Sequence, residues 1–237
     1  MGNKTPIWSA IAQSLRADIA EARYGPGDKL PTEAALASRF GVNRHTVRRA
    51  LGDMAEAGVI HTRRGAGIFV AQRPTDYPIG TRVRFHQNLR AAGRLPAKEI
   101  LALETRAADA AEAGALHLAP GEMVHVCDGL SLADGMPVAT FRSSFPAARF
   151  PRMLEALNRL TSVTEALREQ GVADYTRAST RLDARLASPT QALHLQLEPG
   201  APILRTIAVN VDPEGHPIEY GRTWFAGDRM TLTLGAP

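Results

Sequence analysis

Four basic residues at the start of one predicted helix could bind a polyanion. Arg44, His45, Arg48 and Arg49 lie within six residues, away from the apolar side chains of the same segment. Arg44 and Arg48 are four positions apart, so they share one side of a helix. An arginine guanidinium can donate two hydrogen bonds to guanine O6 and N7 in the major groove of DNA. These residues favour sequence-specific DNA binding, and a small helical domain with solvated arginines is the alternative.

Smaller polar groups and a basic turn accompany these cations. Thr46 and the amides that begin the helix suit phosphate oxygens, which fix the register of a protein on a duplex. In a turn between two short predicted strands, Gly65 and Gly67 remove side-chain bulk where the minor groove would be approached, and neighbouring arginines add charge. The expected DNA contacts are Thr32, Glu33, Asn43, Arg44, His45, Thr46, Arg48, Arg49, Arg63, Arg64, Gly65 and Gly67.

Three helices and a hairpin must position this basic surface. Isoleucine and leucine recur every four residues from Ile7 to Ile19, which predicts a first amphipathic helix. Thr32 and Asn43 can cap the starts of a second and a third helix. Two short strands follow, on either side of the basic turn. This order of elements predicts a winged helix-turn-helix over residues 1–71.

The excess positive charge of the chain is confined to its first third. The formal net charge is +4, with 10 basic and 6 acidic residues in 1–72 and 18 of each in 73–237. A polyanion-binding segment joined to a neutral domain has this distribution. The single cysteine, Cys127, excludes an intramolecular disulfide, and no apolar run approaches the ~18 residues of a membrane-spanning helix. We therefore expect a soluble, cytoplasmic protein with no membrane partner.

The rest of the chain predicts a linker and an α+β domain. Residues 72–80 are polar and contain two prolines, which predicts a linker before a domain over 81–237. Within this domain, residues 115–138 resemble residues 192–218, and His117 aligns with His194. Each copy predicts a short helix, a strand, a tight turn and a returning strand. Helices at 153–160 and 163–167 and a strand at 175–186 separate the copies. Two copies favour one mostly antiparallel sheet, because a lone hairpin with a helix buries too little apolar surface.

The repeat also pairs two arginines. Superposing the copies on Pro137 and Pro217 places Arg142 opposite Arg222, whereas Glu219 is present in one copy only. Two arginines that converge on a pocket would favour a dianion such as a phosphonate or a phosphate ester. Glu219 would accept hydrogen bonds from hydroxyl or amine groups. The alternative is that both arginines form ion pairs within the domain or on its surface.

Patterns for catalysis and metal binding are missing. The sequence has no nucleophile elbow, no HExxH and no glycine-rich phosphate-binding loop. The seven histidines are scattered, and His117 and His194 are more simply structural than metal ligands. Cys127 lies in an apolar strand and is most simply a core residue. We expect no metal, no cofactor and no catalytic residue.

The winged-helix segments resemble the GntR family of bacterial transcription regulators. The runs that carry this resemblance are 31–37, 41–51, 58–60 and 64–70. The two-part layout is similar to the HutC-type branch, whose C-terminal UTRA domain has a chorismate-lyase-like fold and binds a small effector. Residues 78–89 resemble the repressors of phosphonate metabolism in that branch. The resemblance implies a repressor of a catabolic operon that binds a palindromic operator as a homodimer and responds to a small anionic effector. The alternative is a small-molecule enzyme of chorismate-lyase-like fold with a DNA-binding arm.

The resemblance also implies an effector site. HutC-type regulators use the segment after the linker, the central sheet, a serine or threonine after the middle helices, and a glutamate in the last hairpin. Sugar-phosphate-binding relatives carry arginines before the first hairpin turn, and this chain has none there, so other arginines must hold an anion. Phe225 stands where an aromatic hydroxyl is expected. The expected effector-binding residues are Arg82, Arg84, Phe85, His86, Gln87, Asn88, Arg142, Ser143, Ser162, Glu219, Arg222 and Phe225.

Overall fold

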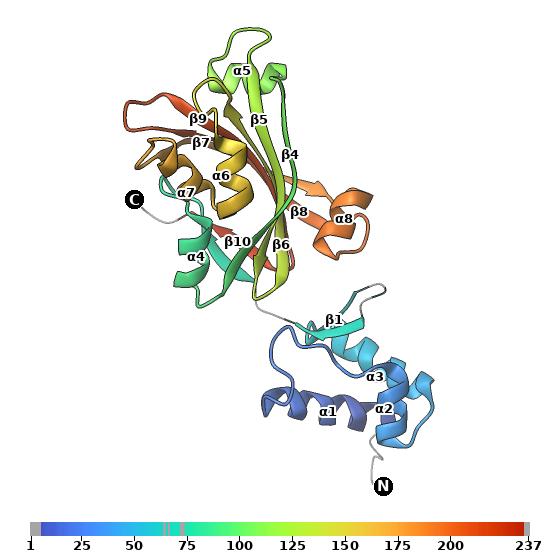
Figure 1. Ribbon diagram of the computed structural model, residues 1–237. Helices are drawn as coiled ribbons and strands as arrows, with labels where there is room; N and C mark the ends of the chain where they lie inside the picture. The colour runs from blue at the N-terminus through green and yellow to red at the C-terminus, as the bar shows by residue number, and fades with distance from the viewer. Residues whose placement is uncertain (1–5, 64, 66, 72–73, 235–237) are drawn as a thin grey trace. The chain divides into compact units, whose positions relative to one another are not determined.

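Three helices and a hairpin build the first of two units, Met1–Arg73 (Figure 1). The structure, a computed structural model, describes residues 6–63, 65, 67–71 and 74–234. The elements of this unit are α1 (Ile7–Ala20), α2 (Glu33–Phe40), α3 (Arg44–Glu56), β1 (Ile60–Arg63) and β2 (Gly67–Val70). This arrangement confirms the predicted winged helix-turn-helix.

Side-chain caps define where α2 and α3 begin. The hydroxyl of Thr32 accepts a hydrogen bond from the Ala35 amide at 3.2 Å, and Asn43 Oδ1 accepts one from the Thr46 amide at 2.9 Å. Both caps are those the sequence predicts, since such oxygens satisfy amides that have no partner within the helix. α1 and α2 pack against α3 around one core of fully buried side chains. This core includes Leu15, Leu36, Val47, Ala50 and Met54.

The second unit, Pro74–Pro237, contains a six-stranded antiparallel sheet (Figure 1). Its strands are β4 (Pro96–Ala107), β5 (Met123–Ala133), β6 (Met136–Pro146), β7 (Thr176–Leu186), β8 (Pro202–Val211) and β9 (Pro217–Ala226), in the order β4-β5-β6-β9-β8-β7. Its helices are α4 (Phe85–Ala91), α5 (Ala110–Leu116), α6 (Met153–Leu160), α7 (Val163–Glu169) and α8 (Pro189–Leu195). The predicted α+β class and antiparallel sheet are confirmed, whereas β4 was not predicted.

The internal repeat is visible in this sheet. β5 and β8 begin 79 residues apart, as do α5 and α8, and the two copies meet where β6 pairs with β9 at the centre. The alignment of His117 with His194 is wrong, because His117 ends α5 in a left-handed conformation and its counterpart after α8 is Gln196. The sheet therefore has a pseudo-two-fold axis between its two central strands.

Helices cover both faces of the sheet. α6 and α7 lie side by side over one face, where the largest core includes Phe141, Phe145 and Leu157 (Figure 1). On the other face α5 contacts β9 and α8 contacts β6. Within the described residues no helix is long and apolar enough to cross a membrane.

Part of the predicted linker is a strand. Thr75–Pro78 forms β3, which pairs in parallel with β10 (Met230–Thr233). Thr75 and Tyr77 are buried and alternate with exposed neighbours, which is the pattern of a half-buried strand. A linker over all of 72–80 is therefore wrong for these four residues, and Gln72 and Arg73 lie outside the described ones.

Candidate functional site

The outer face of α3 carries the predicted cations. Arg44 and His45 occupy its first turn, and both are exposed together with Arg48 and Arg49. Arg44 makes no ion pair with any residue that the structure describes. A residue at the N-terminal end of such a helix is the kind that reaches base edges in the major groove. Arg44 is thus well placed for a direct contact with a base.

Arg48 and Arg49 are held by other helices. Arg48 donates from Nε to Glu33 Oε1 at 3.1 Å and from Nη2 to Glu33 Oε2 at 2.7 Å. This hydrogen-bonded pair lowers the pKa of Glu33. The Arg49 guanidinium lies 4.7 Å from the centre of the Trp8 ring. Any contact of Arg48 with a guanine therefore competes with Glu33, which sequence reasoning did not anticipate.

The hairpin brings one unpredicted cation to this surface. The backbone of Gly67 has a φ of 119°, and a Cβ there would lie 2.7 Å from Lys29 Cε. A bridge between Lys29 and Phe69 sets the lysine beside the hairpin, and both Lys29 and Gly65 line a groove with residues of α2 and α3. Of the arginines predicted for this turn, Arg64 and the side chain of Arg63 lie outside what the structure describes.

A cavity of about 250 Å³ lies on the α6 and α7 face of the sheet. It is lined by α4, the start of α7 and the inward side chains of the sheet. Eight of the predicted effector-binding residues line it: Arg84, Phe85, His86, Gln87, Ser143, Ser162, Glu219 and Phe225. The sequence thus located the cavity, although not all of its charged groups.

Glu219 lines the cavity from β9, one of the two central strands of the sheet. This buried carboxylate accepts a hydrogen bond from Ser143 Oγ at 2.6 Å and another from Asn210 Nδ2 at 2.7 Å. Asn210 Oδ1 in turn accepts one from Arg177 Nε at 3.2 Å. The chain of contacts fixes the orientation of the carboxylate, whose remaining lone pairs can accept from a hydroxyl or amine.

Lys98 brings an unneutralised charge into the cavity. Its ammonium lies 4.2 Å from the centre of the Phe141 ring and 5.7 Å from that of Phe85. Desolvation in the cavity lowers the pKa of Lys98, although the charge of Glu219 opposes this effect. No carboxylate among the described residues forms an ion pair with it. Because a desolvated charge is costly unless paired, Lys98 favours an anionic ligand.

The segment after β3 closes one side of the cavity. Arg84 Nη2 donates to the Tyr175 carbonyl at 2.6 Å and to Asp174 at 3.0 Å, and its guanidinium stacks 3.5 Å from the Tyr175 ring centre. His86 Nε2 is buried without a hydrogen-bond partner among the described residues. Desolvation lowers the pKa of His86, and the charges of Lys98 and Arg90 add to this effect. The unpartnered Nε2 of His86 can therefore form a hydrogen bond with a ligand.

Four predicted effector-binding residues do not line the cavity. Arg82 is exposed and pairs with Asp174 at 2.6 Å, and Asn88 donates to the Pro78 carbonyl at 3.2 Å. Their predicted role is wrong, because these neighbours turn both side chains away from the cavity. The other two, Arg142 and Arg222, point to the opposite face of the sheet, because successive side chains of a strand alternate between its two faces.

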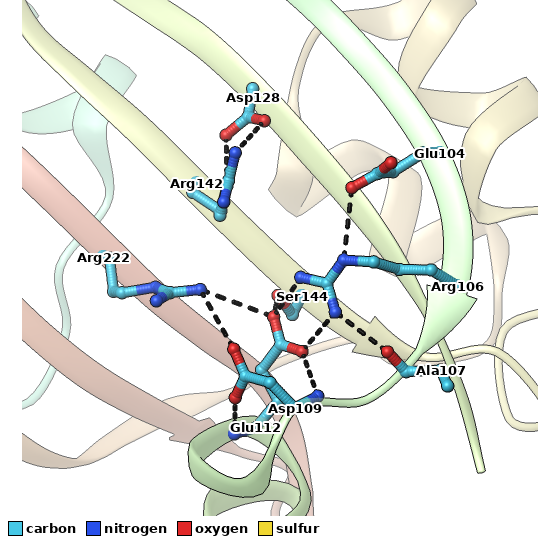
Figure 2. A network of polar contacts seen from close by, with 9 residues as sticks. All are labelled: Glu104, Arg106, Ala107, Asp109, Glu112, Asp128, Arg142, Ser144 and Arg222. Atoms are coloured by element: carbon cyan, nitrogen blue, oxygen red, sulfur yellow. Dashed lines mark hydrogen bonds and ion pairs between the residues drawn. The ribbon is translucent and has the colours of Figure 1, made fainter. Parts of the chain in front are cut away.

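Figure 2 shows Arg142 and Arg222 in ion pairs on the opposite face of the sheet. Since Ser143 faces the cavity, its neighbour Arg142 must face away. Arg142 donates to both carboxylate oxygens of Asp128, at 2.6 and 2.7 Å. Arg222 Nη2 lies 3.5 Å from Glu112 Oε1. The effector role predicted for these arginines is wrong, and the ion-pair alternative is correct.

Comparisons with known proteins agree with both units. Residues 8–70 match the bacterial regulatory proteins of the gntR family, and residues 91–231 match the UTRA domain. An HTH-type transcriptional regulator of Rhizobium meliloti (strain 1021) is 40% identical over 229 residues, which cover 96% of this chain and 94% of that protein. The probable transcriptional regulator PhnF of Escherichia coli (strain K12) is 33% identical over 228 residues, covering 96% and 94%.

A solved structure supports the same assignment. The crystal structure of PhnF from Mycobacterium smegmatis has a TM-score of 0.67 and 27% identity, covering 96% of this chain and 99% of that one. These relatives are transcription regulators, which disfavours the alternative of an enzyme with a DNA-binding arm. The chain belongs to the GntR family of bacterial transcription regulators and has the HutC-type arrangement of a winged helix-turn-helix followed by a UTRA domain.

Proposed function

We propose that this regulator represses a catabolic operon and that a small anion, a phosphonate or a phosphate ester, controls its binding to DNA. The charge of the cavity carries the proposal. Among the residues that the structure describes, five cationic side chains line it and only two carboxylates, and one of the five, Arg84, pairs with Asp174 outside the lining. The cations are Arg84, Arg90, Lys98, Arg168 and Arg177, and the carboxylates are Glu165 and Glu219. An anion would offset this surplus, above all at Lys98.

Similarity to the PhnF proteins supports a phosphonate over a sugar phosphate. The resemblance of residues 78–89 to repressors of phosphonate metabolism points the same way. Relatives that bind sugar phosphates carry phosphate-binding arginines on the strand before the first hairpin turn. In this chain that strand holds Asp128 and Gly129 instead. The cations that could bind an anion in place of those arginines lie on β4, β7 and α4: Lys98, Arg177 and Arg90.

Ligand binding would affect DNA binding through β3, which connects the cavity to the chain that leads to the winged helix. This strand begins at Thr75, and the chain passes from it through Arg84 into α4, whose residues line the cavity. A ligand that draws α4 toward the sheet would pull on β3 and on the chain that leads to the winged helix. Such a movement alters DNA binding only if the ligand binds two arrangements of the protein with different affinities.

A homodimer is part of this proposal. One winged helix contacts only a short half-site, and two modules related by a two-fold axis match a palindromic operator. Light scattering on the full chain checks this, and a monomer that binds a palindrome with full affinity would contradict it.

The experiment that tests the function is a titration of the full chain against two duplexes. One duplex is a palindrome that the protein itself selects from a random pool, and the other is a scrambled control. We expect the selected duplex to bind ~10³-fold more tightly at physiological salt, and 10 mM methylphosphonate to change that affinity. Equal affinity for both duplexes would overturn the DNA-binding role, and indifference to methylphosphonate and inorganic phosphate would overturn the role of the anion.

A further inference from the structure

The floor of the cavity follows the internal repeat. Lys98 pairs with Ser131 in the β4–β5 ladder, and Arg177 pairs with Asn210 in the β7–β8 ladder. Both members of the second pair lie 79 residues beyond those of the first, which is the offset between β5 and β8. Lys98 and Arg177 are therefore equivalent positions on opposite edges of the sheet. Both line the same cavity.

Other pairs on the floor obey the same symmetry. Ser131 and Asn210 both line the cavity, and so do Ser143 and Thr223. Glu219 breaks it, because its counterpart Ala139 is a buried core residue. The floor thus presents a cation at each edge and one carboxylate near the middle.

Glu219 stands between the two cations along the floor. One of its oxygens bonds Ser143 on β6, and the other bonds Asn210 on β8, which in turn holds Arg177. On the other side, Lys98 reaches from β4 over the ring of Phe141 on β6. A single tetrahedral anion that touched both cations would lie against the Glu219 carboxylate and be repelled by it. Two separate anionic groups, one on each side, avoid this repulsion.

The two ends differ in chemistry. Lys98 is a compact point charge close to His86 and to a second cation, Arg90. This end suits the more highly charged group, and the buried His86 Nε2 can share in binding it. Arg177 uses Nε for Asn210, and no residue that the structure describes bonds its two Nη groups, which can therefore face a planar carboxylate.

We propose that the ligand of this cavity carries an acidic group at each end, a phosphonate or phosphate on Lys98 and a carboxylate on Arg177, with any hydroxyl or amine placed over Glu219. This rests on the proposed function, because it specifies which anions the regulatory cavity takes. The chemical class is a short-chain phosphonocarboxylate or its phosphate ester.

Calorimetry on the full chain with a homologous series tests the proposal. The probes are phosphonoalkanoates from phosphonoacetate to 5-phosphonopentanoate, each compared with the alkylphosphonate of equal chain length. We expect an optimum chain length at which the phosphonoalkanoate binds at least ~10-fold more tightly than its partner, since its carboxylate adds a charge-assisted contact with Arg177. Equal affinity of the two series overturns this inference and leaves the anion-binding function intact. Failure of both series to bind overturns the function as well.

Variants assign each end. Arg177→Met should remove the advantage of the phosphonoalkanoate, so that both series bind this variant with equal affinity at each chain length, whereas Lys98→Met should weaken both series. Arg142→Met is the matched control, because it removes a repeat-paired arginine from the opposite face. The wild-type series remains decisive if a variant does not fold. An unchanged preference in Arg177→Met would overturn the assignment of the carboxylate end.

Discussion

Arg142 and Arg222 face each other across β6 and β9 at the centre of the pseudo-symmetric sheet, on the face away from the cavity. Each is the other's counterpart in the repeat, and each is neutralised by a carboxylate from its own face. The repeat therefore generates two pairs of cations. The central pair stabilises the sheet and α5, and the pair at the edges, Lys98 and Arg177, enters the cavity.

The central pair should not contribute to ligand binding. We expect Arg142→Ala and Arg222→Ala to retain the rise in melting temperature that methylphosphonate gives the wild type. Arg142→Ala should lower the free energy of unfolding by at most ~1 kcal/mol, because the ion pair of Arg142 with Asp128 is partly exposed. Arg222→Ala should lower it by more. Thermal shift and urea unfolding measure both effects. Loss of the ligand response in either variant would show that the wrong pair has been assigned to the cavity.

Glu112 should make the UTRA unit sensitive to acid. Burial opposes ionisation of this fully buried carboxyl, but bonds from Arg106, the Asp109 amide and Ser144 outweigh it and lower the pKa of Glu112 to about 2 (Figure 2). The stabilisation is complete above pH 4.5, its usual pKa, and is lost as the pH falls toward 2.

Replacing Glu112 by Gln tests this pH dependence. Glu112→Gln should lower the free energy of unfolding by on the order of 3 kcal/mol at pH 7, since it removes the buried carboxylate of the pair and leaves Arg106 only its exposed partner Glu104. The difference from the wild type should shrink between pH 4.5 and 2. Urea unfolding at several pH values checks this, and a difference that stays constant down to pH 2 would contradict it.

Arg44 should contact a base directly, whereas Arg48 is already hydrogen-bonded to Glu33. We expect Arg44→Ala to weaken binding to the selected palindrome by ~1–3 kcal/mol and to change binding to scrambled duplex much less. Glu33→Ala should release Arg48, so the effect of Arg48→Ala should differ between the wild-type and Glu33→Ala backgrounds. Anisotropy titrations give all four affinities. If Arg44→Ala weakened both duplexes equally, its contact would be with phosphate.

Lys98 should give ligand binding a distinctive pH dependence. Only its ammonium form attracts an anion, and desolvation lowers the pKa of Lys98 from its usual 10.5. Affinity for methylphosphonate should therefore fall as the pH rises, before an ordinary lysine would lose its proton. Lys98→Arg, which stays charged, is the control for titration of the ligand itself. Identical pH profiles for the two proteins would contradict the role of Lys98.

The sequence predicted best the features that neighbouring residues determine. Thr32 and Asn43 cap the helices that they precede, and the repeat predicted an antiparallel sheet. The side of the sheet to which Arg142 points was not predictable, because both faces of β6 are buried and its residues show no alternation. Lys98 was missed because β4 is an edge strand in which no residue is fully buried, so its sequence lacks a clear apolar face. The repeat could have revealed it, since Lys98 and Arg177 obey its offset.

The central claim is that an anion in the UTRA cavity controls DNA binding, and one measurement tests it most directly. The dissociation constant for the selected palindrome is measured with and without the phosphonoalkanoate that calorimetry shows to saturate the cavity. The account predicts a change of at least ~5-fold for the wild type, abolished in Lys98→Met and retained in Arg142→Ala. An unchanged dissociation constant for the wild type at saturating ligand would contradict it.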